Sequence, residues 1–219
     1  MITLAEENYL KAIWAINLNT NKRASTNEIA NETNTSAASV SDMLKKLQEK
    51  KLINYEKYKG VKLSKKGNNL ATCIIRKHRL WETFLVNTLN FKWGEVHNVA
   101  EQLEHVKSDK LIDKLESFLG NPRFDPHGEP IPTKEGKIPN SNTIPLNKLE
   151  VGSKGNVMGV LLDKKSFLEY LTRLNISIGT SIEILEKISF DQSLSIKIEN
   201  TKQHISSDVA KYLLIKTMH

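Results

Sequence analysis

The chain has 219 residues, 39% of them hydrophobic, and its 32 lysine and arginine residues outnumber 25 acidic ones, giving a net charge of +7. This length allows one large domain or two to three small ones, and the positive charge suits a polyanion such as nucleic acid. The single cysteine, Cys73, excludes a disulfide framework and a thiolate zinc cluster. Because no stretch approaches the ~20 apolar residues of a membrane span and no signal-peptide pattern opens the chain, we expect a cytoplasmic protein that does not enter the membrane.

The first third of the chain predicts a winged helix-turn-helix. Thr3 begins an amphipathic helix, and Ser25 with Glu28 forms a capping box that opens a second, short helix. After a turn, residues 36–50 have helical periodicity. Residues 52–58 and 61–63 then alternate as two strands around a tight turn. Two short helices followed directly by a hairpin are typical of this DNA-binding unit.

The charge distribution favours DNA as the partner of this unit. Residues 1–66 contain 12 lysine and arginine residues against 7 acidic ones, so most of the net charge lies there. The alternative is a winged helix used for protein contacts. We expect contacts to double-stranded DNA from the third helix and the hairpin, through Ser36, Ala37, Ala38, Ser39, Ser41, Asp42, Lys45, Lys46, Lys57 and Lys59.

Histidine and glutamate recur at helical spacing between residues 78 and 105. His78 and Glu82 lie one turn apart on a predicted helix over residues 68–91. At about 100° per residue, the next helix brings a second set onto one face, namely His97, Glu101, Glu104 and His105. Imidazole and carboxylate ligands suit a divalent transition metal. The alternative is a solvated face that carries these residues by chance.

The remaining sequence predicts a dimer surface, a tether and a small barrel. Apolar residues of the helices up to Leu119 exceed what a small domain can cover, which favours a homodimer. All six prolines lie between Pro122 and Pro145. Within that stretch His127 is a metal-ligand candidate, but we favour its interpretation as a turn residue. Short alternating segments after Pro145 indicate a β-barrel of about 70 residues.

The predicted fold is therefore mainly α with small β. It consists of an N-terminal winged helix-turn-helix, a helical dimerisation domain and a C-terminal SH3-like β-barrel. The expected boundaries are 1–66 for the DNA-binding domain, 67–139 for the helical domain, 140–152 for a linker and 153–219 for the barrel.

This arrangement resembles the diphtheria toxin repressor family of metal-dependent repressors, essentially from end to end, with a barrel similar to the family's SH3-like or FeoA-like domain. The strings that carry the resemblance are Glu7-Asn8-Tyr9-Leu10, Arg76-Lys77-His78-Arg79-Leu80, Glu104-His105-Val106-Lys107-Ser108-Asp109 and Gly128-Glu129-Pro130-Ile131-Pro132.

The resemblance implies two metal sites per subunit. A regulatory site would use Asn8, Glu101, Glu104 and His105. An ancillary site would use His78, Glu82 and His97, completed from the barrel by Asp163. Iron-type members carry methionine and cysteine at the positions of Asn8 and Glu101, whereas manganese-type members carry carboxylates. The oxygen and imidazole ligands here favour Mn²⁺, with Fe²⁺ as the alternative.

The resemblance also implies a non-enzymatic repressor. A metal that joins the DNA-reading end to the dimer scaffold would order a homodimer on a palindromic operator, expected at metal-uptake genes. Two other classes remain open: a winged-helix regulator that senses an organic ligand, and a two-metal enzyme. The enzyme lacks support because no catalytic string such as His-Glu-x-x-His is present.

Overall fold

Two compact units make up the chain in the computed structural model, which describes residues 2–20, 22–56, 59–162 and 164–218. The first unit contains residues up to 78 together with 102–108 and 132–138, and the second contains the remainder. In the sequence, the first unit gives way to the second within helix α4 (Lys65–Asn87), after His78. Among the described helices, none is long and apolar enough to cross a membrane.

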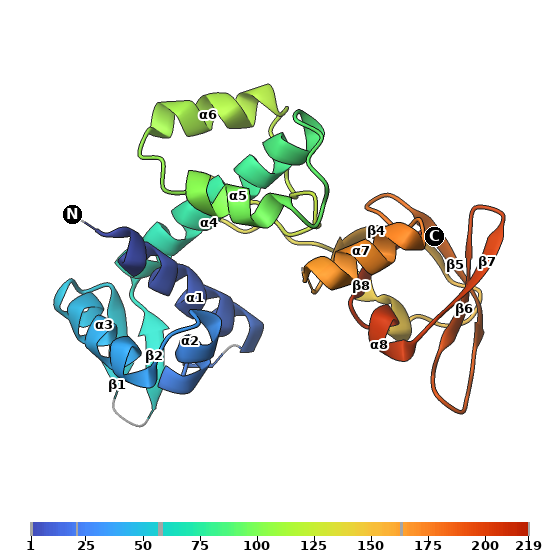
Figure 1. Cartoon of the computed structure of the whole chain (residues 1–219), viewed down its shortest axis with the longest axis horizontal. Coiled ribbons are helices and arrows are strands. Elements are labelled where there is room, and N and C mark those ends of the chain that lie inside the picture. Colours follow the sequence, from blue (N-terminus) through green and yellow to red (C-terminus); the bar gives the residue numbers. More distant parts are fainter. Residues whose placement is uncertain (1, 21, 57–58, 163, 219) are drawn as a thin grey trace. The chain divides into compact units, whose positions relative to one another are not determined.

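Three helices and a hairpin form the N-terminal part of the first unit (Figure 1). They are α1 (Leu4–Thr20), α2 (Thr26–Glu32), α3 (Ala37–Glu49), β1 (Ile53–Glu56) and β2 (Gly60–Leu63). The two strands pair antiparallel, from Ile53 opposite Leu63 to Glu56 opposite Gly60. This arrangement confirms the predicted winged helix-turn-helix.

Both helices of the helix-turn-helix begin at a polar cap. The Ser25 side chain accepts the backbone N–H of Glu28, and the Glu28 carboxylate accepts the backbone N–H of Ser25, which is the predicted capping box. At the start of α3, Ser36 Oγ accepts the N–H of Ser39. Because these side chains satisfy backbone donors that have no partner within the helix, the sequence locates both helix starts well.

A continuous apolar core holds α3 in place. Leu10 and Ile13 of α1, Ile29 of α2, and Leu44 and Leu47 of α3 are all essentially inaccessible to solvent. Burial of each such side chain contributes roughly 1.5–3 kcal/mol. The core thus fixes the inner face of α3 and leaves its outer face exposed.

The helix that carries His97 is shorter than predicted. We expected it to continue to His105, but α5 (Val96–Leu103) ends earlier and Glu104 and His105 form a turn. The prediction was wrong because contacts distant in sequence outweigh the local helical preference. The Val106 carbonyl accepts a hydrogen bond from Lys77 Nζ at 2.9 Å, and the side chains of Glu104 and His105 are held by α1 and α4, as detailed below.

The helical part of the second unit has a small core of its own. Leu80 of α4 packs with Ile112 and Leu115 of α6 (Asp109–Phe118) and with Ile131 from the proline-rich segment. On the outside, Leu89 is 52% exposed and Phe118 is 68% exposed. These two side chains are candidates for the homodimer surface that the sequence predicts on the helices.

The C-terminal part of the second unit is a six-stranded antiparallel sheet with the order β3-β8-β4-β5-β6-β7. Its elements are β3 (Ile144–Pro145), η1 (Leu146–Lys148), β4 (Lys154–Val160), α7 (Lys165–Arg173), β5 (Ser181–Lys187), β6 (Leu194–Ile198), β7 (Thr201–Ile205), α8 (Ser207–Ala210) and β8 (Leu213–Thr217). Alternate residues such as Ile182, Ile184 and Ile196 point into the core. The predicted small β domain is therefore confirmed, while the domain boundaries stay predictions.

Candidate metal centre

Charged side chains of the first unit meet between α1 and the turn after α5, and we call this group the α1 cluster. Its members are Glu7, Lys11, His78, Glu104 and His105. Glu104 lies at the centre with a fully buried side chain. Its two carboxylate oxygens lie 2.9 and 3.0 Å from Lys11 Nζ, and Oε2 also lies 2.6 Å from His78 Nδ1.

His105 connects the turn after α5 to the first helix. Its Nδ1 lies 2.5 Å from Glu7 Oε2, and its Nε2 lies 3.8 Å from Glu104 Oε1. Two carboxylates and an imidazole thus converge from segments far apart in sequence. This is a donor set that a divalent cation accepts.

The structure brings together only part of the predicted regulatory site. Glu104 and His105 lie together in the α1 cluster, whereas Glu101 Oε1 lies 3.6 Å from His97 Nε2. Asn8 is exposed, and the neighbouring Glu7 supplies the carboxylate at His105. Because adjacent residues of a helix project about 100° apart, α1 directs one of the two toward His105. Glu7 was not among the predicted ligands, although its acidic side chain in the Glu7-Asn8 string was an available signal.

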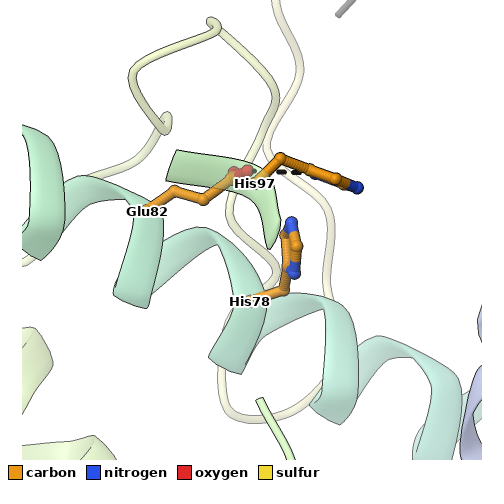
Figure 2. A group of neighbouring side chains, drawn as sticks. All are labelled: His78, Glu82 and His97. Atoms are coloured by element: carbon orange, nitrogen blue, oxygen red, sulfur yellow. Dashed lines mark hydrogen bonds and ion pairs between the residues drawn. The ribbon is translucent and has the colours of Figure 1, made fainter. Parts of the chain in front are cut away.

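A second group of ligand-type side chains surrounds Glu82 on α4, and we call it the Glu82 cluster. Glu82 and His78 lie on consecutive turns of α4, and His97 comes from α5 (Figure 2). One ligand atom from each of these three residues lies within 4.8 Å of the others. The predicted ancillary triad is therefore a geometrically close group. Asp163, the fourth predicted ligand, lies outside the described residues.

Two carboxylates hold His97 in its charged form. Its Nδ1 lies 3.3 Å from Glu82 Oε1, the contact drawn as a dashed line in Figure 2. Hydrogen bonding to Glu101, then to Glu82, raises the pKa of His97 to about 10 against the opposing effect of burial. Since a ligating imidazole must be unprotonated, a metal here would replace a proton on His97.

Asp125 and His127 complete a second, more buried arrangement around the same glutamate. Their ligand atoms and one from Glu82 lie within 4.8 Å of one another, and all three residues are buried. His127 Nδ1 lies 3.6 Å from Glu82 Oε2. From the sequence we favoured a turn residue over a metal ligand for His127, and Asp125 was not singled out. The Asp-Pro-His spacing was an available signal, because residues two apart in an extended segment point to the same side.

Backbone contacts fix which nitrogen of His127 faces the cluster. Its Nε2 lies 3.2 Å from the carbonyl oxygen of Trp93, and the Trp93 ring stacks on the imidazole at 5.7 Å between ring centroids. A carbonyl only accepts hydrogen bonds, so Nε2 must carry the proton. In the neutral ring, Nδ1 then has a lone pair directed at the cluster, as a metal ligand requires.

Neighbouring charges in the Glu82 cluster shift the pKa values of His127 and Asp125. Burial lowers the pKa of His127, but hydrogen bonding to Glu82 and the charge of Glu82 outweigh this effect and raise it to about 9. Burial raises the pKa of Asp125 to about 7, with further contributions from the charges of Glu129 and Glu82. Such mutual perturbation of carboxylates and histidines is common at metal-binding and catalytic sites.

The residues present fit a divalent cation. Among the described residues, Asp125 Oδ2 is buried and makes no hydrogen bond, with Arg79 Nε 3.6 Å away as an ion-pair partner. Its other oxygen, Oδ1, accepts the backbone N–H groups of His127 and Glu129 at 2.8 and 2.9 Å. A buried carboxylate that is held by one oxygen and lacks a hydrogen bond at the other is suited to a cation.

The segment that carries Asp125 and His127 is fixed against the barrel. The backbone N–H of Val160 on β4 donates to the His127 carbonyl at 2.9 Å. Gly128 has a φ of +82°, and a Cβ at this position would lie 1.7 Å from the Met158 carbonyl oxygen. Only glycine fits here, so β4 determines where His127 is placed.

The predicted DNA-contacting side chains share the outer face of α3. Ser36, at the N-cap, and all the α3 candidates are exposed, namely Ala37, Ala38, Ser39, Ser41, Asp42, Lys45 and Lys46. Asp42 pairs with Lys45 at 3.1 Å, and on the wing the exposed Lys59 pairs with Glu56 at 3.1 Å. Lys57 lies outside the described residues. The exposed face of α3 is compatible with groove binding, and the individual DNA contacts stay predictions.

A winged helix-turn-helix beside clusters of ligand-type side chains is the arrangement expected of a metal-responsive DNA-binding regulator, and comparisons with known proteins give the same class. Residues 1–61 match the N-terminal DNA binding domain of iron dependent repressors. Residues 64–133 match the metal binding and dimerisation domain of the same proteins. Residues 144–217 match the FeoA domain.

Individual relatives point the same way. A solved structure titled "Manganese-dependent transcriptional repressor complex with manganese" is 31% identical, with a TM-score of 0.86, and the match covers 97% of this chain and 100% of that one. The iron-dependent repressor IdeR of Mycobacterium tuberculosis is 33% identical over 132 residues, which cover 57% of each protein. A probable metal transport system membrane protein of Chlamydia trachomatis is 44% identical over 75 residues, which cover 34% of this chain but 17% of that protein.

The chain therefore belongs to the diphtheria toxin repressor family of metal-dependent transcriptional repressors. This family is non-enzymatic, which confirms the prediction that the protein is not an enzyme.

Proposed function

We propose that the protein is a cytoplasmic repressor whose homodimer binds a palindromic DNA operator, at metal-uptake genes, when a divalent cation is bound. The observation that carries this proposal is the α1 cluster. In it, Glu7 on the helix preceding the helix-turn-helix contacts His105 in the turn after α5. A cation shared by these segments would hold α1, and with it the DNA-reading helices packed on α1, in one position.

Glu104 and His105 are the central ligands of the proposed regulatory ion. Glu7 or Asn8 would add an oxygen from α1, and Glu101 would add one from α5. We place a second ion at Glu82, with imidazole from His78, His97 or His127, and with Asp125 or Asp163 as a further carboxylate. The bound cations would supply positive charge that neutralises these buried carboxylates.

Manganese is the proposed metal, with iron as the alternative. Every proposed ligand atom is a carboxylate or amide oxygen or an imidazole nitrogen, and these hard or borderline donors suit Mn²⁺. The single cysteine, Cys73, is exposed on α4 and is not among the candidate ligands. Because Mn²⁺ is the weakest binder in the general affinity order, selectivity must be judged against that order.

The energetic requirement for a switch is modest. A cation need only bind the DNA-competent arrangement better than the others. A hundredfold preference, about 2.7 kcal/mol, makes operator affinity a hundredfold higher when metal is bound.

DNA binding with and without metal tests the proposal. Duplexes would be selected from a randomised pool with the full chain, once with Mn²⁺ and once with EDTA. Affinity for the selected duplex would then be measured by fluorescence anisotropy against Mn²⁺, Fe²⁺, Co²⁺ and Zn²⁺. We expect at least a hundredfold tighter binding with the activating metal, and equal binding in EDTA would overturn the switch.

Variants assign the switch to the α1 cluster. Glu104→Ala and His105→Ala are expected to abolish the metal response. His204→Ala removes an exposed histidine from β7 and serves as the matched control, which should keep the full response. If the two cluster variants respond to metal like wild type, a regulator that senses an organic ligand becomes the better hypothesis.

A further inference from the structure

Lys11 contacts the carboxylate at the centre of the α1 cluster. Its Nζ lies 2.9 and 3.0 Å from the two oxygens of Glu104, whose side chain is completely buried. The lysine reaches this carboxylate from α1 across 93 positions of sequence. The Lys11 ammonium therefore supplies positive charge to Glu104, the carboxylate that we propose as a metal ligand.

Both oxygens of Glu104 are already engaged in this arrangement. In addition to the lysine, His78 Nδ1 lies 2.6 Å from Oε2. A lysine ammonium is a compact point charge with three hydrogen-bond donors and no lone pair. It therefore cannot be a metal ligand beside the Glu104 carboxylate. A divalent cation that binds Glu104 would face a positive charge about one hydrogen-bond length from its own ligand atom, which strongly disfavours binding unless the ammonium leaves.

Lys11 has a route by which to leave. Its side chain is 22% exposed, whereas Glu104 is 0% exposed. Lysine has a flexible four-carbon stem and a strongly hydrated head group. The ammonium can therefore move toward solvent while Glu104 stays in place.

We propose that Lys11 is an internal cation that holds Glu104 in the metal-free protein and must be displaced when metal binds, so that it sets the metal concentration at which the repressor responds. The inference rests on the proposed function, because it takes Glu104 to be a metal ligand. It assigns to Lys11 the role of tuning metal affinity, without making it a ligand.

The same unit contains a matched control for this ion pair. Lys50 Nζ lies 2.7 Å from Glu6 Oε1, and the Glu6 side chain is 4% exposed. Both pairs join a lysine to a buried glutamate and both involve α1, but Glu6 is not a member of the α1 cluster. Replacing Lys50 therefore measures the general effect of losing such a pair and one unit of positive charge.

The experiment compares Mn²⁺ affinity, by isothermal titration calorimetry, in the metal-free full-length proteins. We expect Lys11→Met to bind Mn²⁺ at least tenfold more tightly than wild type, and Lys50→Met to stay within about twofold. Lys11→Arg keeps the positive charge and is expected to keep an affinity near that of wild type. If Lys11→Met binds Mn²⁺ no more tightly than wild type, or if Lys11→Arg binds as tightly as Lys11→Met, the inference is wrong.

Thermal unfolding separates this role from a purely structural one. Both methionine variants are expected to unfold at lower temperature than wild type without metal. Saturating Mn²⁺ should restore Lys11→Met, because the cation replaces the lost ammonium, and leave the deficit of Lys50→Met in place. An unrestored Lys11→Met would contradict the inference. Should Lys11→Met fail to fold, Lys11→Gln keeps a hydrogen-bond donor without the charge and is expected to show the same tighter binding.

Failure of the inference differs from failure of the proposed function. If wild type binds Mn²⁺ and loses it in Glu104→Ala, but Lys11→Met binds no more tightly, only the role of Lys11 is wrong. If Glu104→Ala binds Mn²⁺ as wild type does, Glu104 is not a ligand and the proposed function fails at this site.

Discussion

The imidazole of His105 lies 2.5 Å from the carboxylate of Glu7, although the two residues are 98 positions apart in the chain. Between them in sequence lie the helix-turn-helix, the wing and two further helices. The contact therefore joins the helix that precedes the DNA-reading unit to the turn after α5.

Glu7 is the first residue to test. Because its carboxylate contacts His105, Glu7→Gln removes an anionic oxygen from the proposed regulatory site and is expected to weaken Mn²⁺ binding at least tenfold. Asn8→Ala tests the rival candidate on the exposed neighbouring position and is expected to change the affinity less. Calorimetric titration of both variants measures the difference. A larger loss in Asn8→Ala would show that the amide, as the family resemblance implies, is the ligand from α1.

The ancillary ion provides a second test. His127→Ala removes the imidazole nitrogen that the Trp93 carbonyl directs at Glu82, so we expect bound Mn²⁺ to fall from about two ions per subunit to about one. Metal content after equilibrium dialysis measures the number of ions. His204→Ala should retain both. Two ions bound to His127→Ala together with one bound to His97→Ala would favour the triad of His78, Glu82 and His97 instead.

Phe118 tests the proposed homodimer. Its ring is 68% exposed at the end of α6 and makes an edge contact with Phe84 at 6.1 Å between centroids. Phe118→Ser is expected to weaken self-association at least tenfold, as measured by sedimentation equilibrium, because it removes apolar area from the proposed interface. Phe190→Ser is the control, since Phe190 is 97% exposed between β5 and β6. Equal dimerisation of wild type and Phe118→Ser would exclude this surface.

Lys46 tests how α3 meets DNA. This residue is exposed in the last turn of α3, and a lysine ammonium is a point charge, so we expect it to contact the phosphate backbone. Lys46→Ala is expected to weaken binding to all duplexes by a similar factor and to reduce the salt dependence by about one counterion. Anisotropy titrations at several salt concentrations give both quantities. A loss confined to one duplex sequence would mean that Lys46 reads bases.

Local signals in the sequence were enough to predict much of the fold. Ser25, Glu28 and Ser36 mark helix starts through hydrogen bonds within three residues, so the helix-turn-helix follows from the sequence. Alternation in Ile182 and Ile184 likewise predicts strand β5 of the C-terminal sheet. These features depend on neighbours in the chain, which a sequence displays directly.

The parts that the sequence did not reveal depend on distant contacts. Helix α5 ends at Leu103 because Glu104 and His105 are held by side chains from α1 and α4, and no local signal marks that end. Asp125 was likewise missed as a candidate metal ligand, because its place beside Glu82 depends on how a distant segment is buried. The periodicity of a sequence shows which residues share one face of a helix or strand. It does not show which other segment that face contacts.

Gly128 makes the position of His127 in the Glu82 cluster depend on strand β4. Because any side chain at this position would collide with the Met158 carbonyl, the backbone next to His127 must lie flat on β4. A cation held by Glu82, Asp125 and His127 would then act as a removable cross-link between α4 and the segment that lies on β4. In a chain whose single cysteine permits no internal disulfide, the metal supply of the cell would decide whether that cross-link is made.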